Sequence, residues 1–158
     1  MVEESSNPQF EGTVRLMNVL MGLTLAFKKK YGEEALKVTK NFVEEMGVSI
    51  GNQVKKDAEI SGSDIKDIES ALRAWQDSVI LGPPPKSEIE GNKLIMKRKL
   101  PSKCPALQVA KQMNVPLETI CKTVAFPMFR GVTKAVNPKA KHTSLKISRE
   151  ECVDVIEI

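Results

Sequence analysis

The chain has 158 residues, of which 41% are hydrophobic and 28% are charged, and its formal net charge is +4. These values are ordinary for a globular protein and exclude collagen-like, coiled-coil and strongly disordered classes. The length fits one domain with a substantial core. Aromatic residues make up only 4% of the chain, so a nucleic-acid surface of stacked aromatic and basic side chains is not expected.

Two further exclusions concern location. No apolar run approaches the roughly 18–20 residues that cross a bilayer, and the acidic residues 1–6 lack the layout of a secretory signal. We therefore expect a cytoplasmic protein without a membrane span. Three widely spaced cysteines in such a chain are expected to be thiols or metal ligands rather than a disulfide framework.

The first half of the chain predicts three helices. Apolar residues are so dense over 12–30 that this helix is expected to be buried on much of its circumference, or to form a dimer interface. A second helix is predicted over 33–56, and its Gly47 and Gly51, four residues apart, indicate a kink or tight packing rather than a binding site. A third is predicted up to residue 81, with Ser63 or Asp64 as its capping residue.

The prolines in residues 83–86 divide the chain into a helical half, 1–82, and a half with strands and helices, 87–158, within one domain, 1–158. The second half predicts a strand hairpin, two helices and another strand hairpin, so the fold class is α+β. The helices are predicted over 105–113 and 117–136, with a kink at Pro127 unless the helix begins afresh there. The strands are predicted over 87–90, 93–100, 140–147 and 152–158.

Short basic clusters end one helix and one strand. Lys28-Lys29-Lys30 and Lys97-Arg98-Lys99 are each backed by apolar sequence, and we interpret both as solvated ends of these elements.

Cysteine carries the most concentrated chemistry in the sequence, because no phosphate-binding loop, metalloprotease helix or serine nucleophile turn is present. Cys104 precedes Pro105 at a predicted helix start, where the helix dipole and the neighbouring Lys103 are expected to lower the thiol pKa. The alternative is a small buried hydrophobic residue, and this alternative applies with more force to Cys121, which lies on an apolar helix face.

The order of Cys104-Pro105, Cys121, Asn137-Pro138 and Cys152-Val153-Asp154 resembles the L-2-amino-thiazoline-4-carboxylate hydrolase-like group, and is similar to the related 4-vinyl reductase-type domains. The resemblance implies helices packed over a twisted antiparallel sheet, with a cavity for an apolar small molecule. Relatives of the second type hold zinc with cysteines and an acidic residue. By position Cys121 and Cys152 match two of those ligands and His142 falls near the acidic one, whereas Leu145 stands near another expected cysteine.

Three cysteines and one histidine also make a familiar zinc set, so Cys104, Cys121, His142 and Cys152 are candidate ligands of a structural zinc. If Ile147 pairs with Cys152 across a tight turn, however, His142 lies roughly 17 Å away along the strand. A shared site then requires a looser turn or a bulge.

Three functions remain open. The first is a binding domain for an apolar small molecule, with the N-terminal helices and Phe126, Met128 and Phe129 lining the pocket. The second is a hydrolase of a small heterocyclic amino acid, with Cys104 as nucleophile, or with Cys104, Cys121 and Asp154 around a catalytic metal. The third is a dimeric scaffold or tethering protein, a homodimer formed through the apolar first helix.

Overall fold

The computed structural model describes residues 7–81, 84–100 and 103–158. The chain begins with the helices α1 (Pro8–Tyr31), α2 (Glu34–Asp57) and α3 (Ile65–Val79). The hairpin β1 (Lys86–Glu90) and β2 (Lys93–Lys99) follows. After it come α4 (Pro105–Met113) and a helical run made of α5 (Leu117–Ile120), η1 (Cys121–Ala125) and α6 (Phe126–Val136). The hairpin β3 (Lys141–Ile147) and β4 (Glu151–Glu157) ends the chain. The predicted α+β class and order of elements are confirmed.

Local sequence signals set the ends of several helices. The side chain of Asp64 accepts hydrogen bonds from the backbone amides of Lys66 and Asp67 and so caps α3, as predicted. Gly32 follows α1 with a positive φ of 70°, which a residue without a Cβ adopts at little cost. Pro83 of the predicted linker lies outside the described residues, and β1 already includes Lys86.

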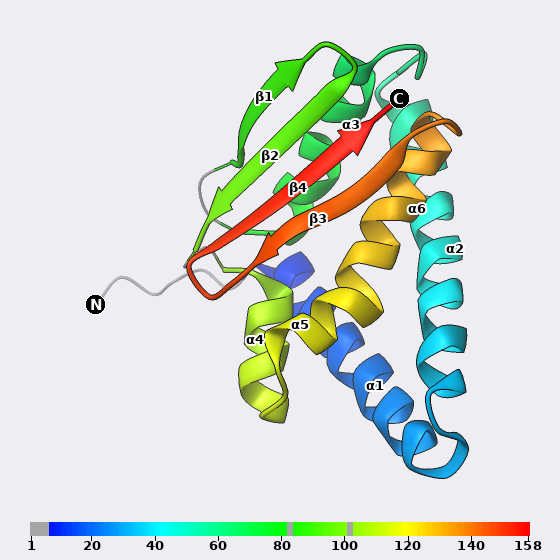
Figure 1. The fold of residues 1–158 in the computed structure, drawn as a ribbon, viewed down its shortest axis with the longest axis vertical. Coiled ribbons are helices and arrows are strands. Elements are labelled where there is room, and N and C mark those ends of the chain that lie inside the picture. The colour runs from blue at the N-terminus through cyan, green and yellow to red at the C-terminus, as the bar shows by residue number, and fades with distance from the viewer. Residues whose placement is uncertain (1–6, 82–83, 101–102) are drawn as a thin grey trace.

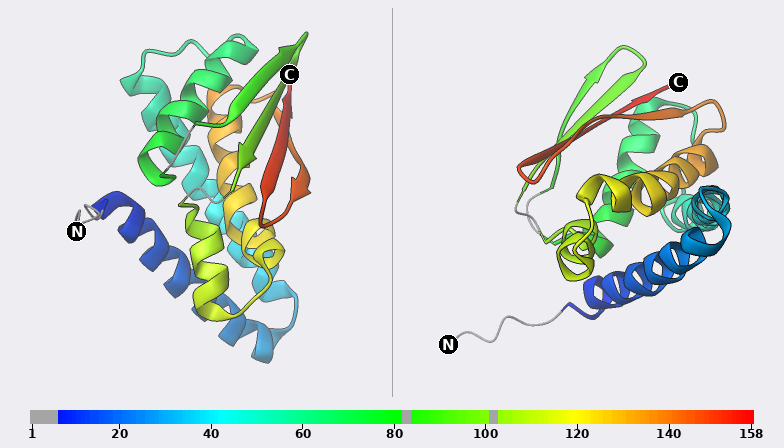
Figure 2. Two further views of the ribbon diagram at one scale, coloured as in Figure 1. Left: turned by 90° about the vertical axis from the view of Figure 1, so that its left-hand side faces the viewer. Right: turned by 60° about the horizontal axis from the view of Figure 1, so that its bottom comes forward.

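The four strands form one antiparallel sheet in the order β1-β2-β4-β3. The last strand, β4, therefore lies between the two hairpin partners β2 and β3 and pairs with both (Figure 1). The helices lie on one side of the twisted sheet (Figure 2). One face of the sheet is thereby turned toward the helices, and this face carries the residues discussed below.

Buried side chains form two clusters, and each draws on both halves of the chain. One joins α1 and α2 to α4 and the segment from Ile120 to Val124. The other joins α3 to α6, β2 and β4. The predicted proline linker thus separates two stretches of sequence that share their cores.

Glycines allow α2 and α6 to cross at very short range. A Cβ atom at Gly131 of α6 would collide with the carbonyl oxygen of Glu44 and lie 2.7 Å from the amide nitrogen of Val48. On the facing helix, a Cβ at Gly51 would lie 2.7 Å from the carbonyl oxygen of Val132. Of the two roles expected for Gly47 and Gly51, a kink or tight packing, the structure shows tight packing.

The first helix is buried on one side only. Its buried residues include Val14, Met17 and Met21, whereas Val19 and Leu23 are more than half exposed. The predicted burial of α1 on much of its circumference is therefore wrong for the single chain, because α2 and α4 cover one side of it. The dimer alternative stays a prediction. Within the described residues, no helix combines the length and apolar character that a bilayer span requires.

Two alanine substitutions test the glycine crossing. Gly131→Ala should destabilise the protein by about 1–3 kcal/mol, because its methyl group has only rigid backbone to displace. Gly22→Ala is the matched control, since among the described residues nothing lies within 4 Å of a Cβ built there. It should raise the free energy of unfolding by about 0.5–1 kcal/mol, as alanine does in a helix interior. Urea denaturation measures both, and equal effects of the two substitutions would contradict the close crossing.

Candidate functional site

A cavity of about 200 Å³ lies between the inner face of the sheet and the helices. Side chains from α1, α2, α3, β2, β4 and the helical run line it, and most of them are apolar. Leu16 of α1 is part of the wall and is also 53% exposed. The wall therefore reaches the molecular surface beside α1.

The three residues predicted to contact a ligand lie in this wall. Phe126, Met128 and Phe129 belong to the first turns of α6, and all three line the cavity. Trp75 of α3 lines it as well and packs edge-on against Phe129, with ring centroids 4.9 Å apart. The N-terminal helices were expected in the wall without any of their residues being named, and the place of Trp75 on the apolar face of a predicted helix was a usable signal.

Pro127 explains the shape of the helical run at this point. The predicted kink takes the form of a wide π turn over η1, in which the amide of Phe126 donates to the carbonyl of Cys121. Proline has no amide hydrogen, and its ring would collide with the carbonyl four residues before it in a regular helix. The wide turn carries Cys121, Val124 and Ala125, all of which line the cavity.

The three cysteines reach this cavity from different elements. Cys104 is the N-cap residue of α4, Cys121 begins η1 and Cys152 lies in β4. All three are free thiols, and all three line the cavity. The fold thus brings the predicted sulfur residues to one place.

Burial keeps these thiols protonated. It raises the pKa of Cys152 to about 11 and raises the pKa of Cys121 further. Burial also raises the pKa of Cys104, although the amides of Leu107 and Ala106 and the guanidinium of Arg98 act in the opposite direction. The predicted lowering of the Cys104 pKa is therefore wrong, because loss of hydration outweighs the helix dipole.

His142 contacts Asp154 and Phe129. Its Nε2 atom lies 3.1 Å from Oδ1 of Asp154, and its side chain is only 2% exposed. Its ring stacks on Phe129, with centroids 5.7 Å apart. Of His142 and Asp154, it is Asp154 that lines the cavity.

The register of β3 and β4 bears on the predicted zinc. Ile147 pairs with Cys152 as assumed, His142 pairs with Ile156, and the register shifts between Ser144 and Lys146. Among the described residues, no group of three or more His, Cys, Asp and Glu side chains is arranged to hold a metal ion. Zinc bound by Cys104, Cys121, His142 and Cys152 stays a prediction.

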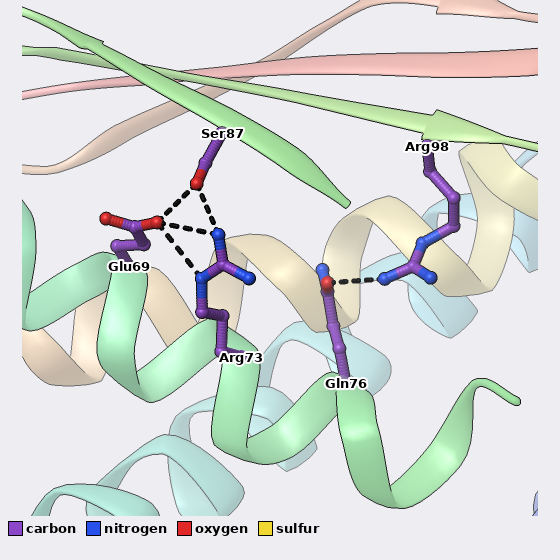
Figure 3. A network of polar contacts seen from close by, with 5 residues as sticks. All are labelled: Glu69, Arg73, Gln76, Ser87 and Arg98. Atoms are coloured by element: carbon purple, nitrogen blue, oxygen red, sulfur yellow. Dashed lines mark hydrogen bonds and ion pairs between the residues drawn. The ribbon is translucent and has the colours of Figure 1, made fainter. Parts of the chain in front are cut away.

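That the charged residue Arg98 lines the cavity was not predicted from the sequence. Arg98 of β2 is 9% exposed, and its guanidinium donates to Oε1 of Gln76 at 2.9 Å (Figure 3). The interpretation of Lys97-Arg98-Lys99 as a solvated strand end is wrong for Arg98. Strand alternation was the missed signal, because Arg98 shares the buried face of β2 with Leu94 and Met96.

Outside the cavity, a second polar network joins α3 to strand β1 of the sheet. Nε of Arg73 donates to Glu69 at 3.0 Å, and the hydroxyl of Ser87 in β1 bonds to both side chains (Figure 3). The hydrogen bond from Ser87 and the charge of Arg73 lower the pKa of Glu69.

A comparison with the models of known protein families, with curated proteins and with solved structures finds no match for this chain. The resemblance to 4-vinyl reductase-type and hydrolase-like domains therefore stays an expectation drawn from the residues.

Thiol chemistry tests the burial of the cysteines. At pH 7.5 iodoacetamide should label all three at least about tenfold more slowly in the folded protein than in guanidinium, because the thiolate is the reactive form.

The stability of the protein should also depend on pH. Above the ordinary thiol pKa of 9.0, the unfolded chain releases its thiol protons while the folded protein keeps them. The folded state therefore loses stability as pH rises. The free energy of unfolding should therefore fall between pH 9.0 and about 11, and less steeply in Cys152→Ala. Rapid labelling of native Cys104 at neutral pH would contradict this account.

Proposed function

We propose that this protein is a binding domain for an apolar small molecule, similar in kind to the 4-vinyl reductase-type domains, and that the ligand occupies the cavity described above. The observation that carries the proposal is the wall itself, in which Phe126, Met128, Phe129 and Trp75 contribute apolar surface. Apolar walls with a few polar groups are typical of small-molecule sites. Three free thiols support the expectation of a reducing, cytoplasmic compartment.

The size of the cavity sets the size of the ligand. A cavity of roughly 150 Å³ lined by Leu, Ile and Phe holds benzene, and this one measures about 200 Å³. One aromatic ring with a short substituent is therefore the expected scale. Methionines in the wall, such as Met46 and Met128, are flexible enough to adjust to such a guest.

Tryptophan fluorescence provides a direct test, because Trp75 is the single tryptophan of the chain and lies in the wall. Benzene should change the emission of Trp75 in a saturable way and raise the melting temperature. Ala125→Leu, which places a larger side chain in the wall, should abolish both effects. Ala35→Leu, at the first turn of α2 and outside the cavity lining, should preserve them. A linear, unsaturable response of the parent protein would contradict the proposal.

The hydrolase alternative draws less support from the site. A cysteine nucleophile needs a thiolate and a base nearby, whereas burial raises the pKa of Cys104. The chain's one histidine has its Nε2 directed to Asp154. We therefore keep Cys104 and Asp154 as cavity residues of the binding domain, and a role for them in hydrolysis stays a prediction.

One observation favours a homodimer, the second part of our proposal. α1 and α2 expose several large apolar side chains at half or more of their area: Leu16, Val19, Leu23, Phe27, Tyr31, Val38 and Phe42. Such a surface is expensive to leave in water and is typical of an association site. A second copy would cover it with the same surface, as a twofold axis requires.

Charge substitutions on this face test the dimer. The parent protein should be a dimer at micromolar concentration in size-exclusion chromatography with light scattering, and Val19→Glu with Leu23→Glu should convert it to a monomer. Both side chains are exposed in the single chain, so its folding should be preserved. Leu145→Glu, at a residue of β3 that is 66% exposed, is the control and should leave the dimer intact. A monomeric parent protein would remove the proposal.

A further inference from the structure

The cavity has a polar end, and we propose that it binds the carboxylate of a small amphipathic acid, with Arg98 holding the carboxylate and the apolar wall holding the hydrocarbon body. This inference rests on the proposed function and names the chemical class of its ligand. The expected ligand is a carboxylic acid with one aromatic ring, or a chain of comparable volume.

The position of Arg98 carries the inference. Among the described residues that line the cavity, the charged ones are Arg98 and Asp154. Arg98 lies on the inner face of β2, where strand alternation places it in line with Leu94 and Met96. A guanidinium has five N–H donors in a planar fork that fits the two oxygens of a carboxylate. Its buried position makes each such hydrogen bond stronger than it would be in water.

Neighbouring groups add to the positive character of this end. Gln76 accepts from Arg98 through Oε1, which leaves its Nε2 atom as a donor in the same wall. Pro105 and Ala106, in the first turn of the nine-residue helix α4, line the cavity as well. The amides of Ala106 and Leu107 act on the Cys104 sulfur beside them. The backbone amides at the start of α4 and the helix dipole favour a negative charge at this position.

Asp77 and Asp154 both act electrostatically on Arg98 and would oppose an anion there, and the partner of Asp154 limits its opposition. Oδ1 of Asp154 lies 3.1 Å from Nε2 of His142, which belongs to β3, the strand that pairs with β4. Arg98 pairs across the sheet with Cys152 instead and reaches toward Gln76 of α3. The carboxylate of the ligand is therefore expected between Arg98 and the start of α4, where the guanidinium also acts on Cys104.

Three ligands of equal shape test the inference in the parent protein: 3-phenylpropionate, 3-phenylpropan-1-ol and 3-phenylpropylamine. Trp75 fluorescence at neutral pH reports the affinity of each. The acid should bind about tenfold or more tightly than the alcohol, because a charge-assisted pair replaces a neutral hydrogen bond. The amine should bind more weakly than both. An alcohol that binds as tightly as the acid, or an amine that binds best, would overturn the inference.

Variants of two arginines on the same helix–sheet boundary localise the effect. Arg98→Gln should weaken binding of the acid about tenfold or more and leave the alcohol unchanged. Arg73→Gln is the matched control, since Arg73 joins α3 to the sheet through Glu69 and Ser87 outside the cavity, and it should change neither affinity. If Arg98→Gln fails to fold, the comparison of acid and alcohol in the parent protein still decides.

The outcomes for this inference and for the proposed function are distinguishable. Saturable binding of benzene together with equal affinities for acid and alcohol would preserve the apolar pocket and overturn the carboxylate site. Absence of binding by benzene and by all three phenylpropyl compounds would overturn the proposed function, and the inference with it.

Discussion

The close crossing of α2 and α6 is the constraint on which the rest of the structure depends. Gly47, Gly51 and Gly131 bring the two backbones so near that a single methyl group would collide with the facing chain. Packing at this range fixes both the rotation and the height of α6 beneath the sheet. Phe126, Met128 and Phe129 at its start are thereby presented to the cavity, and Val132 and Val136 further along are buried against α3 and the sheet.

The cavity follows from what the neighbouring elements leave unfilled. Pro127 widens the helical run just before α6, while Arg98 and Asp154 occupy inner-face positions of β2 and β4 where apolar residues such as Leu94 and Ile156 stand elsewhere. Burying a guanidinium and a carboxylate costs free energy unless each is paired or hydrogen-bonded. Gln76 and His142 supply such partners. A polar end in an otherwise apolar space is consistent with an amphipathic ligand.

Local signals in the sequence predicted the elements well, and tertiary effects were beyond them. The Asp64 cap and Pro105 depend on a few neighbouring residues, so the starts of α3 and α4 could be predicted. The place of β4 between β2 and β3 depends on pairing between distant segments. The Cys104 pKa depends on burial that no local pattern reports. The run of three basic residues suggested that Arg98 is exposed to solvent, whereas strand alternation places it on the buried face of β2.

Nuclear magnetic resonance of methionine methyl groups tests the central claim, an apolar ligand site in this cavity, most directly. Met17, Met46, Met96 and Met128 line it, whereas Met21 and Met113 are core residues that are not part of its lining. Addition of benzene should shift the methyl signals of the first four residues in a saturable way and leave those of Met21 and Met113 nearly unchanged. Unchanged signals for all six, or equal shifts throughout, would contradict a ligand site at this position.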